Sequence, residues 1–466
     1  MRKITWKMAL AGGVSLALLA GCALKEPPSS EEVRQEALSG VELPSAWKAG
    51  GPAGEMKDNW LSGFSDPQLN ALVDEALQHN PDLRVSAARV EQAGEYVNQA
   101  KAALLPAITL FGTGGVKSGG GDLSSAIQGA ALPISWEIDL WGRLRYGRNA
   151  AEQTSLAAQA DFEYARQSLA AAVARSWFTA SETWLQGQIA TEMVQSSEQL
   201  LALAEIRYKV GVGSEQDVAL AQASLGSLRD GAKQIELAHQ QALRALELLV
   251  GRYPSAELAI RHDLTTLPRP VPVGMPLAML ERRPDLVAAE RRVAAAFNRV
   301  GEARAARLPK ITLNASVAAM TSEIIEMKED FDNPTSGAGA RLIAPVYQGG
   351  ALVSQVEIRT LEQKEAVAAY AASALKALGD VENALAAGGN LAEREELLQR
   401  AVADNRRALD LVQTSYRTGK ADMRAVQSQL LDLQAARLSL LRVQSEQLSQ
   451  RVNLHLALGG GFDQAS

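Results

Sequence analysis

The residues that could do chemistry in this chain are few, and their spacing does not favour catalysis. Glu137 and Asp139 are two carboxylates on one face of a predicted strand, which suits solvated polar residues better than acid–base chemistry. The sequence has no glycine-rich phosphate loop and no Ser/His/Asp set, and its nine methionines form no copper relay. The four histidines are scattered without metal-ligand spacing: His79, His239, His262 and His455. We therefore predict no catalytic site, no metal and no cofactor.

The only cysteine, Cys22, stands at a position with a recognisable covalent chemistry. A basic start is followed by an apolar run from Met8 to Ala20 that is too short to span a bilayer and is typical of a signal peptide. The run ends in Leu-Ala-Gly-Cys, which resembles the bacterial lipobox, where the cysteine is lipidated and becomes the new N-terminus. An aspartate directly after the lipidated cysteine commonly retains lipoproteins in the inner membrane. This chain has Ala23 at that position, which favours the outer membrane. The alternative is an ordinary signal peptide that ends near a cysteine.

The composition predicts long helices and offers no electrostatic case for nucleic acid. The 466 residues are 21% charged and 5% aromatic, and the formal net charge is −6. This mix is typical of helical chains, and an acidic protein is a poor partner for a polyanion.

One stretch of the sequence occurs twice. Pro81–Leu110 and Pro284–Leu313 align without a gap at an offset of 203, and 15 of the 30 pairs are identical. At an offset of 208, Tyr208 matches Tyr416, and further pairs match beyond it. The period is far longer than that of solenoid repeats. We therefore predict two copies of a unit of about 200 residues, with internal pseudo-symmetry.

Each copy is predicted to contain two strands joined by a polar loop, at 117–125 in the first copy and about 323–337 in the second. Apolar and polar residues alternate over 132–140 and over 311–318. Strands of this length suit a transmembrane barrel with an apolar outer face and a polar lumen. Because four strands cannot close a membrane pore, strands from several chains would be needed. A soluble hairpin packed on the helices is the alternative.

Two long helical hairpins complete the copies. The predicted helices are 143–208, 215–250, 352–417 and 422–458, and the longest are about 100 Å long. Tight turns at 210–213 and 418–420 carry glycines that supply left-handed backbone angles. Two shorter helices are expected after the caps Asp66 and Asn80, each with proline at its first position. The proline-rich segment 267–276 is expected to be an extended strap.

These elements divide the chain into six parts. They are a signal peptide (1–21), a lipid-anchored irregular tether and equatorial segment (22–60), a first repeat (61–258), a proline-rich crossover (259–275), a second repeat (276–459) and a tail (460–466). The strands occupy about 106–140 and 309–347, and the helical hairpins about 143–250 and 352–458.

Lipobox, duplication, paired strands and paired hairpins together resemble TolC-type outer membrane efflux proteins, most closely the lipid-anchored branch typified by OprM. The specific motifs are Trp136–Arg143, Tyr208–Gly213, Arg283–Leu286, Pro345–Gly350 and Tyr416–Gly419. The resemblance implies a mixed α and β membrane protein, a homotrimer with four strands per chain in one β-barrel and a hollow periplasmic tunnel of helices. It implies a passive duct that carries drugs or other small compounds, joined by a periplasmic adaptor to an inner-membrane pump of RND type. The alternatives are the duct of a type I protein secretion system and a coiled-coil scaffold lipoprotein without a pore.

The resemblance also implies roles for residues at the hairpin tips. Those expected to contact the adaptor are Gly211, Val212, Gly213, Gly419 and Lys420. Asp217 and Tyr416 match an aspartate and a tyrosine that help to hold the periplasmic aperture shut, which predicts a hydrogen bond between them. Where TolC has an arginine and two acids, this chain has Ala421, Ala425 and Ser428. We therefore expect an aperture without the arginine link and with weaker cation selectivity, unless another acid lines it.

Overall fold

The computed structural model describes residues 24–52, 54, 58–113, 127–322 and 334–462. Contacts divide the chain into two compact units, and each unit takes residues from both halves of the sequence. The first holds the chain up to Val41, Ala88–Ala160 and Val287–Ala372; the second holds Glu42–Ala87, Asp161–Leu286 and the chain from Ser373. The domain boundaries drawn from the sequence stay a prediction.

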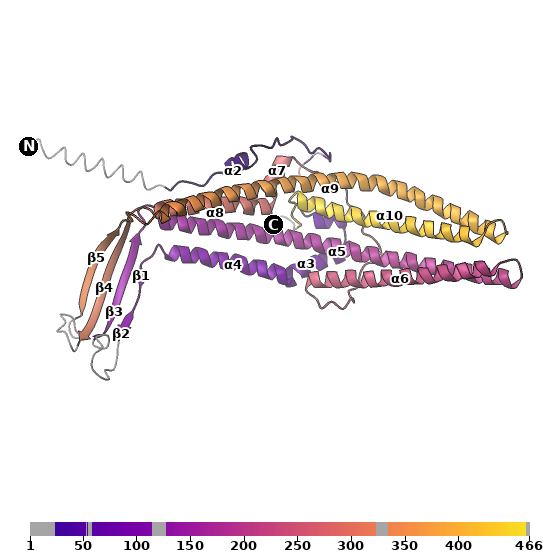
Figure 1. Cartoon of the computed structure of the whole chain (residues 1–466), viewed down its shortest axis with the longest axis horizontal. Coiled ribbons are helices and arrows are strands. Elements are labelled where there is room, and N and C mark those ends of the chain that lie inside the picture. The colour runs from indigo at the N-terminus through magenta and orange to yellow at the C-terminus, as the bar shows by residue number, and fades with distance from the viewer. Residues whose placement is uncertain (1–23, 53, 55–57, 114–126, 323–333, 463–466) are drawn as a thin grey trace, which may run out of the picture. The chain divides into compact units, whose positions relative to one another are not determined.

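The first unit contains an antiparallel sheet, drawn with its strands side by side in Figure 1. Its strands are β1 (Ala107–Ile108), β2 (Phe111–Thr113), β3 (Ile127–Ile138), β4 (Lys310–Ser322) and β5 (Thr335–Ile343). The order is β1-β3-β4-β5, and β2 also pairs with β3. The predicted second loop is therefore too long, because β5 already begins at Thr335. The predicted loop 117–125 lies outside the described residues.

The strand expected after Pro106 is split into β1 and β2, and Pro133 explains the split. Thr109 lies opposite Pro133 between the two paired stretches, and its amide donates to the Pro133 carbonyl at 3.1 Å. Proline has no N–H to return the bond, so the ladder is interrupted at this point.

The two faces of the sheet differ as the alternation predicted. One face carries Trp136 opposite Leu313 and Ile138 opposite Ile311, which in turn lies opposite Leu342. The other face carries rows that are polar or lack bulky side chains: Ser135, Asn314 and Gly339, and Glu137, Thr312 and Arg341. One face is therefore suited to an apolar surrounding and the other to water.

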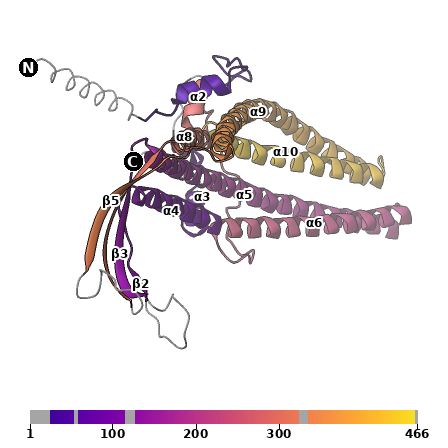
Figure 2. The ribbon, with the colours of Figure 1, turned by 60° about the vertical axis from the view of Figure 1, so that its left-hand side comes forward.

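The helices include those that the sequence predicts, with bounds that agree closely, and several that it does not predict. They are α2 (Ser30–Ala37), the 3₁₀ helix η1 (Trp60–Phe64), α3 (Pro67–His79), α4 (Pro81–Ala102), α5 (Arg143–Lys209), α6 (Glu215–Val250), α7 (Pro276–Arg282), α8 (Pro284–Ala305), α9 (Ala351–Arg417) and α10 (Met423–Ala457). Both α5 and α9 are 67 residues long, and each is followed by a return helix (Figures 1 and 2). Among the described residues, no helix combines the length and apolar character needed to cross a bilayer.

The tether predicted to be irregular contains helix α2, and this part of the prediction is wrong. Ser29 caps the helix by accepting from the Glu32 amide, while the Glu32 carboxylate accepts from the Ser29 amide at 2.8 Å. This reciprocal capping box satisfies amides at the start of the helix, which is why a short helix forms in a segment rich in proline and serine.

Buried caps fix the shorter elements of the second unit. Asp66 is 1% exposed, and its carboxylate accepts from the amides of Gln68 and Leu69, as the predicted cap of α3 should. The same carboxylate accepts from the Trp177 indole and the Thr265 hydroxyl. One buried acid therefore joins α3, α5 and the segment that leads into the proline-rich strap. The strap has neither helix nor strand over 267–275, as predicted, but its last predicted residue, Pro276, begins a helix.

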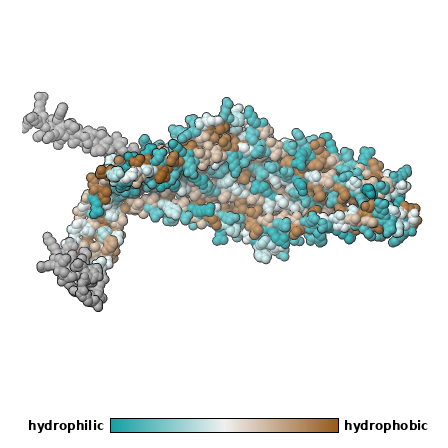
Figure 3. Space-filling model, in the orientation of Figure 1, coloured by the Kyte–Doolittle hydropathy of each residue, from teal (hydrophilic) through white to brown (hydrophobic). Residues whose placement is uncertain are grey.

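Where the structure describes the second unit, apolar side chains gather in clusters that include the following two. One contains Trp60, Phe64, Trp177 and Phe178, and the other lies toward the hairpin turns around Tyr416. On the face shown in Figure 3, hydrophilic and hydrophobic side chains are interspersed along the helices.

Candidate functional site

The hairpin turns of the second unit are built alike. Gly211 follows α5 with a φ of +77°, and Gly419 follows α9 with a φ of +79°. In both turns, the amide of the residue after the glycine donates a hydrogen bond to a carbonyl in the last turn of the helix. The Val212 amide donates to the Arg207 carbonyl at 2.9 Å, and the Lys420 amide donates to the Ser415 carbonyl at 2.8 Å. The predicted left-handed glycines are confirmed at both turns, where an L side chain would be strained.

Gly213 serves a different purpose from the one predicted. It is not among the residues with positive φ. A Cβ at this position would lie 3.0 Å from the Arg207 carbonyl carbon and 3.0 Å from the Tyr208 amide nitrogen. Gly213 is therefore required by close backbone approach, because backbone atoms cannot move aside as a flexible side chain can.

Tyr416 is buried at the centre of the tip. It is 2% exposed and lies in an apolar cluster with Ala204, Ala221, Met423 and Val426, which come from all three neighbouring helices. Burial raises the pKa of the Tyr416 hydroxyl, and the nearby negative charge of Asp217 raises this pKa further. The tyrosine thus packs the first hairpin against the second and stays protonated.

The hydrogen bond predicted between Asp217 and Tyr416 is not formed within this chain. The Tyr416 hydroxyl is buried and has no hydrogen-bond partner among the described residues. Asp217 lies in the first turn of α6, where its amide donates to the Ser214 cap at 3.1 Å. The gating roles of both residues stay predictions.

An arginine that the sequence reasoning missed joins the two hairpins. Arg207, in the last turn of α5, donates to the Tyr416 carbonyl at 3.1 Å and the Arg417 carbonyl at 3.4 Å, at the end of α9. It also donates to the Val212 carbonyl at 3.3 Å in its own turn. Its guanidinium carbon lies 4.7 Å from the centre of the Tyr416 ring. The absence of an arginine at Ala421 therefore does not leave the tips without an arginine link.

Arg207 is chemically suited to this place. The last carbonyls of a helix have no partner within it and carry the negative end of the helix dipole. One guanidinium here serves the last carbonyls of α9 and a carbonyl in the turn that follows α5. A sequence signal existed, because Arg207 directly precedes the repeated tyrosine and stands four residues before the tip glycine.

The remaining predicted tip residues lie at or near the surface. Ala425 and Ser428 are exposed on α10, and Lys420 is exposed in its turn. Val210 and Val212 are apolar yet 66% and 63% exposed. Exposed valines beside a rigid glycine turn form a surface that a partner protein could cover.

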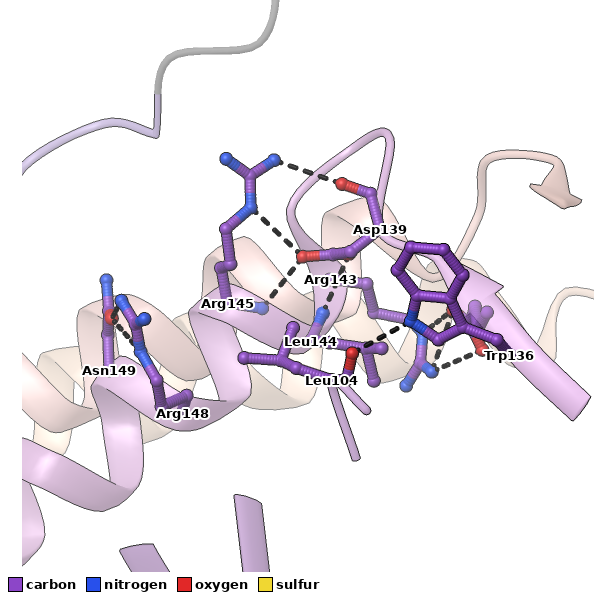
Figure 4. A network of polar contacts seen from close by, with 9 residues as sticks. Leu104, Trp136, Asp139, Arg143, Leu144, Arg145, Arg148 and Asn149 are labelled. Carbon is purple, nitrogen blue, oxygen red and sulfur yellow. Dashed lines mark hydrogen bonds and ion pairs between the residues drawn. The ribbon is translucent and has the colours of Figure 1, made fainter. Parts of the chain in front are cut away.

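The sheet also meets the helices in an ordered way (Figure 4). At the end of β3, Glu137 accepts from the Arg143 guanidinium with both oxygens at 2.9 Å. Asp139 accepts from the Leu144 and Arg145 amides at the start of α5 and pairs with the Arg145 guanidinium at 3.1 Å. The two carboxylates singled out in the sequence are therefore engaged by neighbouring arginines.

The other chemically notable residues give no competing site. Cys22 lies outside the described residues. Where the structure describes the chain, no three His, Cys, Asp or Glu side chains gather as a metal site. His262 stacks on Trp184 at 4.2 Å between ring centres, and His239 lies 3.1 Å from the Thr183 hydroxyl.

Comparison with known proteins adds four findings. The sequence matches the profile of the family described as outer membrane efflux protein over residues 72–252 and 276–460. The pyoverdine export outer membrane protein OpmQ of Pseudomonas putida is 30% identical over 468 residues, 96% of each chain. The cation efflux system protein CusC of Escherichia coli is 28% identical over 415 residues, 87% of this chain and 88% of that protein. The solved structure of the outer-membrane channel OprN aligns with a TM-score of 0.80 and 26% identity over 91% of this chain and 97% of that chain.

Proposed function

The chain belongs to the outer membrane efflux protein family, and from that premise we propose that it is the outer-membrane duct of a tripartite efflux system. A periplasmic adaptor and an inner-membrane pump of RND type would deliver small compounds to it. The observation that carries the proposal is the junction of a two-faced sheet with helices of 67 residues in a chain matched by the family profile in both halves. A scaffold without a pore has no use for such a sheet.

A trimeric barrel would solve a problem that one chain leaves open. The sheet has two edges, β1 with β2 on one side and β5 on the other, whose outer backbone groups lack a strand partner among the described residues. Backbone groups in a bilayer must be paired, and closure is the only way a sheet can achieve this. Three chains with four strand positions each would close a barrel of twelve strands, with the Trp136 face toward lipid and the Glu137 face toward the lumen.

Equivalent contacts support the internal duplication. The Asn80 amide group donates to the Leu249 carbonyl at 2.9 Å, and the Arg283 guanidinium donates to the Ala457 carbonyl at 3.0 Å. The donors are related by the offset of 203 and the acceptors by the offset of 208. Asn80 directly precedes α4, and Arg283 directly precedes α8. In each half, the side chain of this residue therefore caps the end of the return helix, α6 or α10. This arrangement is expected if both halves derive from one unit.

For the tips, we propose that the turns with Val212 and Lys420 meet the adaptor, and that the buried Tyr416 region holds the periplasmic aperture closed. The exposed valines and the contacts across the two hairpins support this. Ala425 and Ser428 would then line a neck that lacks an acidic ring at those positions. The partners are the adaptor and two further copies of this chain.

Lipid anchoring of Cys22 is part of the proposal. The substitution Cys22→Ser should abolish labelling by radioactive palmitate while the trimer still assembles, because the strands anchor the protein independently. Labelling that persists in the variant would refute the assignment.

The function itself can be tested in the cell that makes the protein. A strain that lacks the gene should accumulate ethidium that has entered the cell through the outer membrane. A plasmid copy of the gene should restore ethidium export. The cargo class must be scanned as well, because the relatives named above carry different descriptions, one for pyoverdine and one for cations. If the deletion changes the export of no compound in a broad panel, the efflux assignment fails.

A further inference from the structure

The polar face of the sheet carries an unbalanced set of charges near its helical end. The chain connections identify this end of the sheet, because β3 leads into α5 and β4 begins a few residues after α8. The register places Arg341 of β5 opposite Thr312 of β4, and Thr312 opposite Glu137 of β3. These three residues therefore form one row across the same face.

The acids of this region are already neutralised. Glu137 is held by Arg143 through both carboxylate oxygens. Asp139 pairs with Arg145 (Figure 4). Each acid thus has a guanidinium of its own at the start of α5. Neither carboxylate is left to balance a cation elsewhere on the face.

Two cations remain on the face without an acid. Lys310 is the first residue of β4 and lies opposite Ile343, so Arg341 is its diagonal neighbour, about 7–8 Å away between Cα atoms. Both side chains are exposed, and neither forms an ion pair with a described residue. Gly337 and Gly339, the next residues of β5 on this face, have open space where a side chain would be. The Arg341 guanidinium is therefore uncovered by its own strand.

We propose that Lys310 and Arg341 form a cationic row in the lumen that selects for anionic compounds and retards cationic ones. The inference rests on the proposed function, because it needs the polar face to line a pore. In a trimer the two residues become six cations around one axis. A narrow lumen with low-dielectric walls concentrates such a field and raises the local concentration of counter-ions.

The test uses block by a polyvalent anion. Purified full-length protein in planar bilayers is exposed to inositol hexakisphosphate from the extracellular side, and single-channel current is recorded at low and high salt. We expect reversible block in the wild-type channel that weakens as salt rises, because free charges are screened. In the double variant Lys310→Gln with Arg341→Gln, the half-blocking concentration should rise about tenfold or more.

Control variants separate charge from damage. Arg341→Lys keeps the charge and should keep the block, while Lys25→Gln removes an exposed cation near the predicted lipid anchor and should leave it unchanged. SDS-resistant trimer is measured for every variant, so that misfolding is seen directly. Equal block in the wild-type and double-variant channels, or no block of the wild-type channel, would overturn the cationic row. An absence of discrete channels in every variant would instead count against the proposed duct.

Discussion

Replacing Arg207 should loosen the two hairpin tips from one another. The guanidinium makes its shortest bond, 3.1 Å, to the carbonyl of Tyr416 in the other hairpin. A hydrogen bond to a charged group stabilises by about 1.5–3 kcal/mol. The contact with the Tyr416 ring adds about 1 kcal/mol at a half-buried site. The buried Nε of Arg207 has no partner, which offsets about 1 kcal/mol.

The net coupling is therefore about 1.5–3 kcal/mol per chain, which corresponds to a change of about 10- to 150-fold in the ratio of joined to separated tips. Arg207→Met keeps the aliphatic stem and removes the donors. Spin labels on Val212→Cys and Lys420→Cys, in the two exposed turns, report the separation by double electron–electron resonance. We expect a narrow distance distribution with Arg207 and a broader, longer one with methionine.

Arg207→Lys is the matched control for charge. A lysine keeps the cation but lacks the planar fork that serves carbonyls of both hairpins at once, so we expect an intermediate distribution. If the methionine variant shows the same distances as the parent protein, apolar packing alone joins the tips and the role given to Arg207 is wrong.

Three further predictions concern the second unit. Tyr416→Phe should raise the free energy of unfolding by about 1 kcal/mol, because it removes a buried hydroxyl without a partner; a lower denaturation midpoint would mean that the hydroxyl is bonded in the assembled trimer. Tryptophan at Gly211 or Gly419 should lower drug resistance while membrane levels of trimer stay normal, since only the adaptor-facing turn is strained; loss of trimer would show a purely structural role. Burial lowers the pKa of His455 to about 4, so the unfolded chain binds a proton between pH 6.5 and 4 that the folded chain does not. The free energy of unfolding should fall by about 3 kcal/mol per chain over that range, and His455→Gln should remove this pH dependence in denaturant titrations.

Regular periodicity made most of the fold predictable. The long helices could be read because proline is absent from them and glycine marks their turns, and the strand faces could be read because the alternation at 132–140 and 311–318 is strict. Caps with a local mechanism, such as Asp66 before Pro67, were equally legible.

Features that depend on tertiary neighbours could not be read from the sequence. The break opposite Pro133 needs the register of β3 against the preceding strand, which no local pattern gives. Helix α2 was readable from Ser29 and Glu32, but the irregular composition of the tether obscured it.

The candidate site was predicted in its positions but not in its contacts. Tyr416 and Asp217 were located by their distance from the tip glycines, yet whether a side chain bonds or packs depends on the neighbouring hairpin. For the same reason, Arg207 was missed: its acceptors in the other hairpin, the carbonyls of Tyr416 and Arg417, lie more than 200 residues away in the sequence.

Single-channel recording tests the central claim most directly. Purified full-length protein is added to a planar lipid bilayer, and current is measured at fixed voltage. A trimeric duct predicts discrete, reproducible steps of conductance that appear one channel at a time. A protein that inserts stably as a trimer and yet gives no steps at any voltage or salt concentration would contradict the account.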